Sequence, residues 1–455
     1  MFARVLALTL AFVLFVAPAT AHGGSLGSAT RDTISIPTWL FLLTGGSAIG
    51  ASFLLASFVT DRRLIRAIHE WHRLRAVPAQ QVGRALGALV GLAGLVVVLT
   101  FGFVGPPEPL ANLAILLVWV GWWAGYTGTI YLVGNTWAVL NPWRTIADVL
   151  PSVDAPYPGW LGAWPSVVGL LGLIWIEVVS PLADQPRLLA ELIVGYTLLT
   201  LVGTTVFGPD RWFGSVDPVS RLFRYYGRVA PLTYDHDTGR IRLRLPGTAL
   251  SESRLVDGLD EVGFVIAIVW VTTYDGLVST PAWADVARVL VGAGVPPTLL
   301  YPAVLFAGFG VFLGCYWLAA DYSRRLADSY RTQAFLAKRF APSLLAIAVG
   351  YHLAHYLGYF ISLFPALLAA VAHPFQAPLT VPVAQLPAWF GGLSMTFVLL
   401  GHLLAIWVAH ASAFDVFPGR LQAIKSQYSI TLVMILYTIT SLWIVSQPTI
   451  RPPYI

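Results

Sequence analysis

The sequence is poor in cysteine and in charge, and each shortage excludes a class of protein. Its 455 residues include one cysteine, Cys315. A single thiol excludes a disulfide framework and any zinc or iron–sulfur site built from several thiolates. Charged residues make up only 11% of the chain, whereas they make up about 25% of soluble globular proteins. This composition excludes a cytosolic enzyme, a disordered protein and a nucleic-acid-binding protein.

Long apolar segments take the place of charge. Hydrophobic residues make up 57% of the chain, and the mean hydropathy is +0.73. Segments of about 20 apolar residues can cross a bilayer, and they must be helical because a strand in lipid leaves backbone groups unpaired. We therefore predict an all-α, polytopic helical membrane protein that forms a single domain over residues 22–455. The ten predicted transmembrane helices cover residues 37–59, 83–104, 111–133, 163–180, 187–207, 260–278, 296–320, 342–364, 390–412 and 428–447.

The first 21 residues have the pattern of a secretory signal peptide. Arg4 precedes a short apolar run from Val5 to Val16, and Ala19-Thr20-Ala21 matches a cleavage site. Cleavage there removes residues 1–21 and makes His22 the first residue of the mature chain. The alternative is an uncleaved first helix with His22 in an ordinary loop.

The distribution of positive charge predicts the orientation. With the mature N-terminus outside, 22 of the 27 lysines and arginines fall in inner loops and four fall outside, while Arg4 belongs to the signal peptide. Cytoplasmic loops carry such an excess. We therefore predict a protein of the cell membrane with both mature ends outside.

The longest polar stretch, residues 208–259, is predicted to be a basic cytoplasmic loop. It contains a basic helix at 221–228 and a hairpin at 233–245 around Asp237-Thr238-Gly239. We expect this loop to lie against anionic lipid headgroups at the inner face, with ligand binding as the alternative. The bilayer and these headgroups are the expected partners, and nothing in the sequence identifies a protein partner.

Histidines inside the apolar segments are the first candidates for chemistry, because polar groups are costly in lipid and tend to be functional. His352 and His355 lie three residues apart in the eighth segment, and therefore on one helix face. His402 lies at a similar depth in the ninth segment. Neighbouring antiparallel helices could bring the three onto one divalent metal ion, copper or zinc, or onto a haem iron. The alternative is that they only pack and donate hydrogen bonds.

Two carboxylates and two outer histidines complete the candidate residues. Asp275 and Glu177 lie near the outer ends of the sixth and fourth segments, where each could act as a general base, orient a metal-bound histidine or simply cap a helix. His22, as a free N-terminal residue, would offer its amine and imidazole to copper as a histidine brace. His373, in an outer loop, could complete that second metal site.

A set of short motifs spread along nearly the whole chain resembles one family. In order they are Ala21-His22-Gly23, Asn141-Pro142-Trp143-Arg144, Trp175-Ile176-Glu177, Thr272-Thr273-Tyr274-Asp275-Gly276, Ala354-His355-Tyr356, Gly401-His402, Ala409-His410 and Ser426-Gln427-Tyr428. In this order and spacing the chain resembles the bacterial and archaeal multi-pass membrane proteins labelled fenitrothion hydrolase. The resemblance implies hydrolysis of an organophosphorus triester to a phenol and a dialkyl phosphorothioate.

Three interpretations remain open at this point. The first is a membrane-embedded, metal-dependent organophosphorus triester hydrolase, with the ion at His352, His355 and His402 activating water and Asp275 as the base. The second is a copper-handling or haem-binding membrane protein that uses His22 outside and the histidines within. The third is a transporter or structural subunit in which the histidines pack and relay protons.

Overall fold

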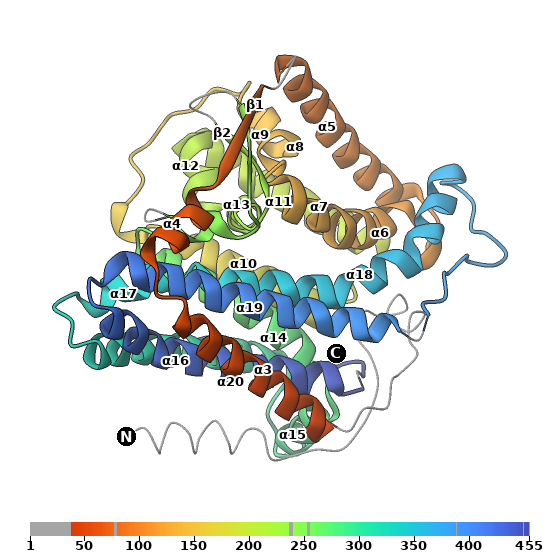
Figure 1. The fold of residues 1–455 in the computed structure, drawn as a ribbon. Coiled ribbons are helices and arrows are strands. Elements are labelled where there is room, and N and C mark those ends of the chain that lie inside the picture. The colour runs from red at the N-terminus through yellow and green to blue at the C-terminus, as the bar shows by residue number, and fades with distance from the viewer. Residues whose placement is uncertain are drawn as a thin grey trace.

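A computed structural model describes residues 38–76, 80–235, 240–252, 255–387, 389–448 and 450–454. The predicted signal peptide and His22 lie outside these residues. Within them the chain is mainly helical, with one small three-stranded sheet (Figure 1). The all-α prediction is therefore confirmed.

Eight helical stretches are long and apolar enough to cross a membrane. They are α5 (Gln80–Val104), α11 (Pro186–Phe207), α14 (Leu259–Val278), α16 (Pro297–Leu326), α19 (Phe390–Val416), α20 (Arg420–Ser446), and the continuous runs Leu113–Val133 and Gln333–Ala372. Two shorter apolar stretches are Gly45–Phe58, within α3 (Thr38–Phe58), and α10 (Trp164–Val179). Each of the ten predicted segments coincides with one of these helices, whereas the number that span the bilayer stays a prediction.

The continuous runs and the connections contain the remaining elements. Leu113–Val133 consists of α6 (Leu113–Leu116), the π-helix η2 (Leu117–Tyr126) and α7 (Thr127–Val133), and Gln333–Ala372 holds α17 (Gln333–Phe340) and α18 (Ser343–Ala372). The short elements are α4 (Arg62–Glu70), η1 (Pro109–Ala111), α8 (Trp137–Leu140), α9 (Pro142–Ala147), η3 (Gly159–Leu161), α12 (Pro209–Arg211), the π-helix η4 (Trp212–Val216), α13 (Pro218–Tyr226), η5 (Thr248–Ser251) and α15 (Pro281–Gly292).

The helices form two groups that share α18 and α14. In Figure 1, α3, α16, α19 and α20 lie side by side, and α5 to α13 form the second group, with α5 at its edge. α18 packs against α19 in the first group and against η2 in the second, and α14 packs against α10, α16 and α18. The side chains of α14 are buried without a break from Val262 to Val271, as expected for an apolar helix surrounded by protein.

Two glycines bring α18 and α19 into backbone contact. A Cβ atom added at Gly350 would lie 2.5 Å from the carbonyl oxygen of Phe397, and one added at Gly401 would lie 2.6 Å from that of Ala346. Because both obstacles are backbone atoms, no side-chain rotation could make room. Small residues at such crossings let membrane helices pack closely.

A small antiparallel sheet lies in the polar part of the chain. β2 (Leu232–Asp235) pairs with β3 (Arg240–Arg244), which confirms the predicted hairpin. The other edge of β3 pairs with β1 (His72–Ala76), a strand that the sequence did not predict. α4 ends at Glu70, just before β1 begins at His72.

The predicted basic helix at 221–228 corresponds to most of α13. Its side chains Arg221, Phe223 and Tyr226 are buried against the rest of the protein. Arg221 can be buried because it pairs with Glu261 at the start of α14, with 2.8 Å between Nη1 and Oε1. This face of α13 therefore contacts protein.

Candidate functional site

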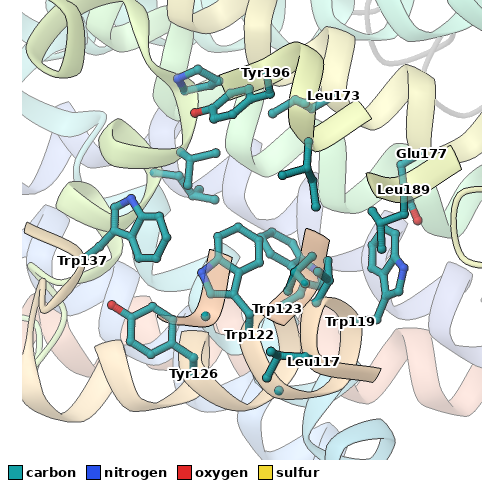
Figure 2. Close-up of a pocket in the computed structure, with 18 of the residues that line it drawn as sticks. Leu117, Trp119, Trp122, Trp123, Tyr126, Trp137, Leu173, Glu177, Leu189 and Tyr196 are labelled. Carbon is teal, nitrogen blue, oxygen red and sulfur yellow. The ribbon is translucent and has the colours of Figure 1, made fainter. Parts of the chain in front are cut away.

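An apolar cavity of ≈ 480 Å³ lies between the second helix group and α18. Its lining comes from α5, η2, α8, α9, α10, α11, α13, α14 and α18. Most of the lining is aliphatic, and the aromatic rings of Trp119, Trp122, Trp123, Tyr126 and Trp137 also face the cavity (Figure 2). Its volume falls within the range of about 300–1,000 Å³ that is typical of small-molecule sites.

The π-helix η2 supplies four of these rings. Asn112 starts the run by accepting hydrogen bonds from Ala114 N (2.9 Å) and Ile115 N (3.2 Å). Gly125 then lets η2 approach α18, because an added Cβ would lie 2.5 Å from a ring carbon of Phe360. Wider π-helical turns are rare and occur often at functional sites. The only sequence signal for this wall is the string Trp119-Val120-Gly121-Trp122-Trp123, which lies within a predicted transmembrane helix and predicts no site by itself.

Three predicted site residues meet at this cavity. Glu177 from α10, Asp275 from α14 and His355 from α18 all line it. Glu177 and Asp275 lie close enough to interact electrostatically with each other, and both also interact electrostatically with the hydroxyl group of Tyr356. In Figure 2, Glu177 lies on the opposite side of the lining from Trp137 and Tyr126. The cavity thus combines an aromatic, apolar body with a small group of acid–base side chains.

Both carboxylates occupy costly positions. Glu177 lies in the last turn of α10 and Asp275 in the last turn of α14. A negative charge near a helix C-terminus is disfavoured by the helix dipole, and an acidic side chain within an apolar segment is costly as well. Such positions favour a functional explanation over helix capping.

Aromatic side chains of α18 surround His355. The ring of Tyr351 stacks on it with centroids 6.0 Å apart, and the ring of Tyr356 meets it edge-on at 4.9 Å. The hydroxyl of Tyr351 lies beside α14, since a Cβ added at Gly276 would be 2.8 Å from it. His355 is therefore held on the cavity wall next to the turn that carries Asp275.

His352 lies behind the wall and not on it. Four rings enclose its imidazole with centroids 4.6 to 6.2 Å away, those of Trp123, Tyr131, Tyr226 and Tyr356. Neither ring nitrogen has a hydrogen-bond partner among the described residues. Three of these four rings also line the cavity, so His352 supports its aromatic wall from behind.

The other predicted histidines lie elsewhere. The Nδ1 atom of His402 hydrogen-bonds to the carbonyl oxygen of Val398 in the same helix, at 2.8 Å. His373 is exposed at the C-cap of α18, eighteen residues or about 27 Å from His355 along the helix. In the part of the chain that the structure describes, no three His, Cys, Asp or Glu side chains form a group that could hold a metal ion. We therefore assign no catalytic step to a metal.

Two motifs of the resemblance have structural roles. Asn141 caps α9 by accepting from Trp143 N (3.0 Å) and Arg144 N (3.1 Å). His410 joins α19 to α20 and to the residue that follows α3: its ring nitrogens contact Gln427 Oε1 at 3.2 Å and the carbonyl oxygen of Val59 at 2.8 Å. These residues shape the helix bundle and do not contribute to the cavity chemistry.

A buried carboxylate also supports the cavity from the loop side. Asp217 caps α13 through Ser220 N at 2.5 Å and accepts a hydrogen bond from the hydroxyl of Tyr196, which lines the cavity. Burial raises the pKa of Asp217, and the bonds from Tyr196 and Ser220 oppose the rise. Asp217 thereby connects the start of α13 to the cavity wall.

Comparison of the chain with protein-family models, with curated proteins and with solved structures gives no match. Function therefore has to be argued from the cavity itself.

Proposed function

We propose that the protein is a membrane-embedded hydrolase of lipophilic triesters with an aromatic leaving group. The observation that carries the proposal is the meeting of Glu177, Asp275 and His355 at one aromatic cavity. The organophosphorus class comes from the motif resemblance described above. A phenyl phosphorothioate triester is uncharged and apolar, so it concentrates in the bilayer and suits a lining of indole and phenol rings.

The proposed chemistry needs one base and one acid. Asp275 takes a proton from a water molecule, the water oxygen bonds to phosphorus, and the bond from phosphorus to the phenolic oxygen breaks. A protonated His355 gives its proton to the departing phenolate. The proton that Asp275 took from water then passes to the His355 imidazole, which is protonated again for the next turnover. Glu177 tunes this exchange through its electrostatic interaction with Asp275.

Filling the cavity tests the proposal. Gly94 lines it, and a Cβ added there meets nothing within 4 Å. We expect Gly94→Phe to weaken binding of a 4-nitrophenyl dialkyl phosphorothioate, measured by quenching of tryptophan fluorescence, by about tenfold or more. Release of 4-nitrophenol should fall in parallel.

Gly83→Phe is the matched control, because Gly83 lies on the same helix, also has open space, and does not line the cavity. Equal quenching in both variants would overturn the cavity as the binding site. Binding by the unaltered protein without phenol release would overturn the hydrolase and leave the binding site standing.

We also propose that both mature ends lie on the outer side of the cell membrane, because lysine and arginine are concentrated in the loops predicted to be cytoplasmic. Since Cys315 is the single cysteine, a Cys315→Ser background allows single-site labelling. In intact cells a membrane-impermeant maleimide should label His373→Cys, whereas it should label Arg240→Cys only after permeabilisation. Labelling of Arg240→Cys in intact cells would reverse the orientation.

A further inference from the structure

A second pocket, of ≈ 380 Å³, lies on the face that carries the small sheet. Its basic side chains come from α4, β1, β3 and α17, and η5 and α19 complete it. These side chains are Arg66, His69, His72, Arg242, Arg244 and Arg339. The pocket has its own lining, separate from the aromatic cavity.

The local geometry of two elements directs pairs of these side chains to one place. Arg66 and His69 are three residues apart on α4 and therefore share a helix face. Arg242 and Arg244 are two residues apart on β3 and share a face of the sheet. The pairing of β1 with β3 sets His72 opposite Arg244. Because β1 follows α4 directly in the chain, this pairing brings α4 next to β3.

Two of the three carboxylates of the pocket, Glu252 and Asp415, have partners, whereas Glu70 forms no ion pair with a described residue. Arg339 pairs with Asp415 at 2.9 Å and also donates to the carbonyl oxygen of Ser251 at 2.6 Å. Arg244 pairs with Glu252 at 2.6 Å, and Arg228 pairs with the same carboxylate at 3.0 Å. Arg66 forms no ion pair with a described residue. The four arginines of the lining outnumber its three carboxylates, so net positive charge remains for an anion.

His69 adds a specific feature. Its Nδ1 atom lies 2.8 Å from the hydroxyl oxygen of Ser251, and that hydroxyl donates its proton to the carbonyl oxygen of Thr248 at 2.9 Å. A serine has one hydroxyl proton, and we assign it to the carbonyl oxygen of Thr248, which makes His69 Nδ1 the donor to Ser251. Neutral His69 then presents Nε2 as a bare acceptor. Nε2 is buried and has no hydrogen-bond partner among the described residues.

The surroundings keep His69 neutral. Burial lowers its pKa, and the charge of Arg339 acts in the same direction, while the backbone of Thr248 opposes them. Trp407 stacks on the imidazole with centroids 6.0 Å apart, which fixes the ring plane. A ligand that suits this pocket must be anionic toward the arginines and must also offer one proton to Nε2.

We propose that this pocket binds the phosphate of a phosphomonoester, in its monoprotonated form, with Arg66 contacting its oxygens and its P–OH donating to His69 Nε2. Arginine suits phosphate oxygens because its guanidinium forms charge-assisted hydrogen bonds. A phosphodiester or a sulfate at neutral pH has no such proton to donate. The group could belong to a lipid headgroup such as phosphatidic acid or to a soluble phosphorylated molecule.

Titration calorimetry on the purified full chain tests the site with inorganic phosphate and sulfate as probes. We expect phosphate to bind and sulfate to bind at least about tenfold more weakly, because one charge-assisted hydrogen bond is missing. Arg66→Gln should weaken phosphate binding by a similar factor. Arg63→Gln, on the same exposed helix but outside the pocket, should leave it unchanged.

A second variant tests the role of His69. In His69→Asn the side-chain amide can still donate to Ser251, but the group corresponding to Nε2 is gone. The variant should lose the preference for phosphate over sulfate while it folds normally. Equal binding of both anions by the unaltered protein, or equal effects of Arg66→Gln and Arg63→Gln, would overturn the proposal.

Competition identifies the source of the phosphate. If phosphatidylcholine vesicles containing phosphatidic acid displace inorganic phosphate, and vesicles of equal charge made with phosphatidylglycerol do not, the pocket binds a lipid headgroup. If glycerol phosphate displaces inorganic phosphate and neither kind of vesicle does, the pocket binds a soluble phosphomonoester. Displacement by both vesicles alike would overturn selective recognition of a phosphomonoester.

Discussion

Asp275→Asn should lower the rate of 4-nitrophenol release by a factor of about 100 or more, because a positioned general base contributes about 10²–10⁴-fold. Asparagine has nearly the same shape as aspartate but cannot take a proton from water. Quenching of tryptophan fluorescence by the triester should persist, since the aromatic lining is unchanged. The measurement is single-turnover phenol release in nanodiscs, compared with binding under the same conditions.

Controls separate catalysis from general damage. Asp285→Asn changes an exposed carboxylate on the next helix, where Asp285 pairs with Arg288 at 2.8 Å, outside the cavity, and it should leave the rate unchanged. Glu177→Gln combined with Asp275→Asn should cost little more than Asp275→Asn alone, because groups that act as a unit are not additive. Full activity in Asp275→Asn would show that the base is another group.

The helices and the titratable residues of the cavity could be predicted from the sequence for a simple physical reason. An apolar run of about 20 residues has few alternatives to a helix, and polar groups within such runs are too costly to be incidental. This argument selected Glu177, Asp275 and His355, which the structure brings to one cavity. The same argument also selected His352 and His402, which are buried but do not line it.

The aromatic cavity could not be predicted, because a tryptophan in an apolar run has the same pattern whether it faces lipid, core or cavity. What distinguishes Trp119, Trp122 and Trp123 is the π-helical winding of η2, and hydropathy does not report winding. The basic pocket could not be predicted from the sequence for a different reason. His69 and Ser251 are 182 residues apart in sequence, and no local pattern near either one predicts the pairing of β1 with β3.

Glu261→Ala should give the largest loss of stability, about 3–5 kcal/mol in the free energy of unfolding, because it leaves a buried arginine without its counter-charge. The Arg221 side chain is only 3% exposed, and it pairs with Glu261, which is 17% exposed. Glu261 also accepts a hydrogen bond from Asp257 N at 2.8 Å, next to the start of α14. The measurement is unfolding in mixed micelles with increasing denaturing detergent.

The chain offers a control and a rescue for this prediction. Arg224 contacts the same carboxylate at 3.2 Å but is 40% exposed, so Arg224→Gln should cost no more than about 1 kcal/mol. The double variant Arg221→Met with Glu261→Met removes both charges and should recover most of the loss, since apolar side chains of similar size often replace a buried ion pair without cost. If Arg224→Gln destabilises the protein as much as Glu261→Ala, burial of Arg221 is not the cause. If the double variant is no more stable than Glu261→Ala, the loss comes from the missing bond to Asp257 and the packing around α14.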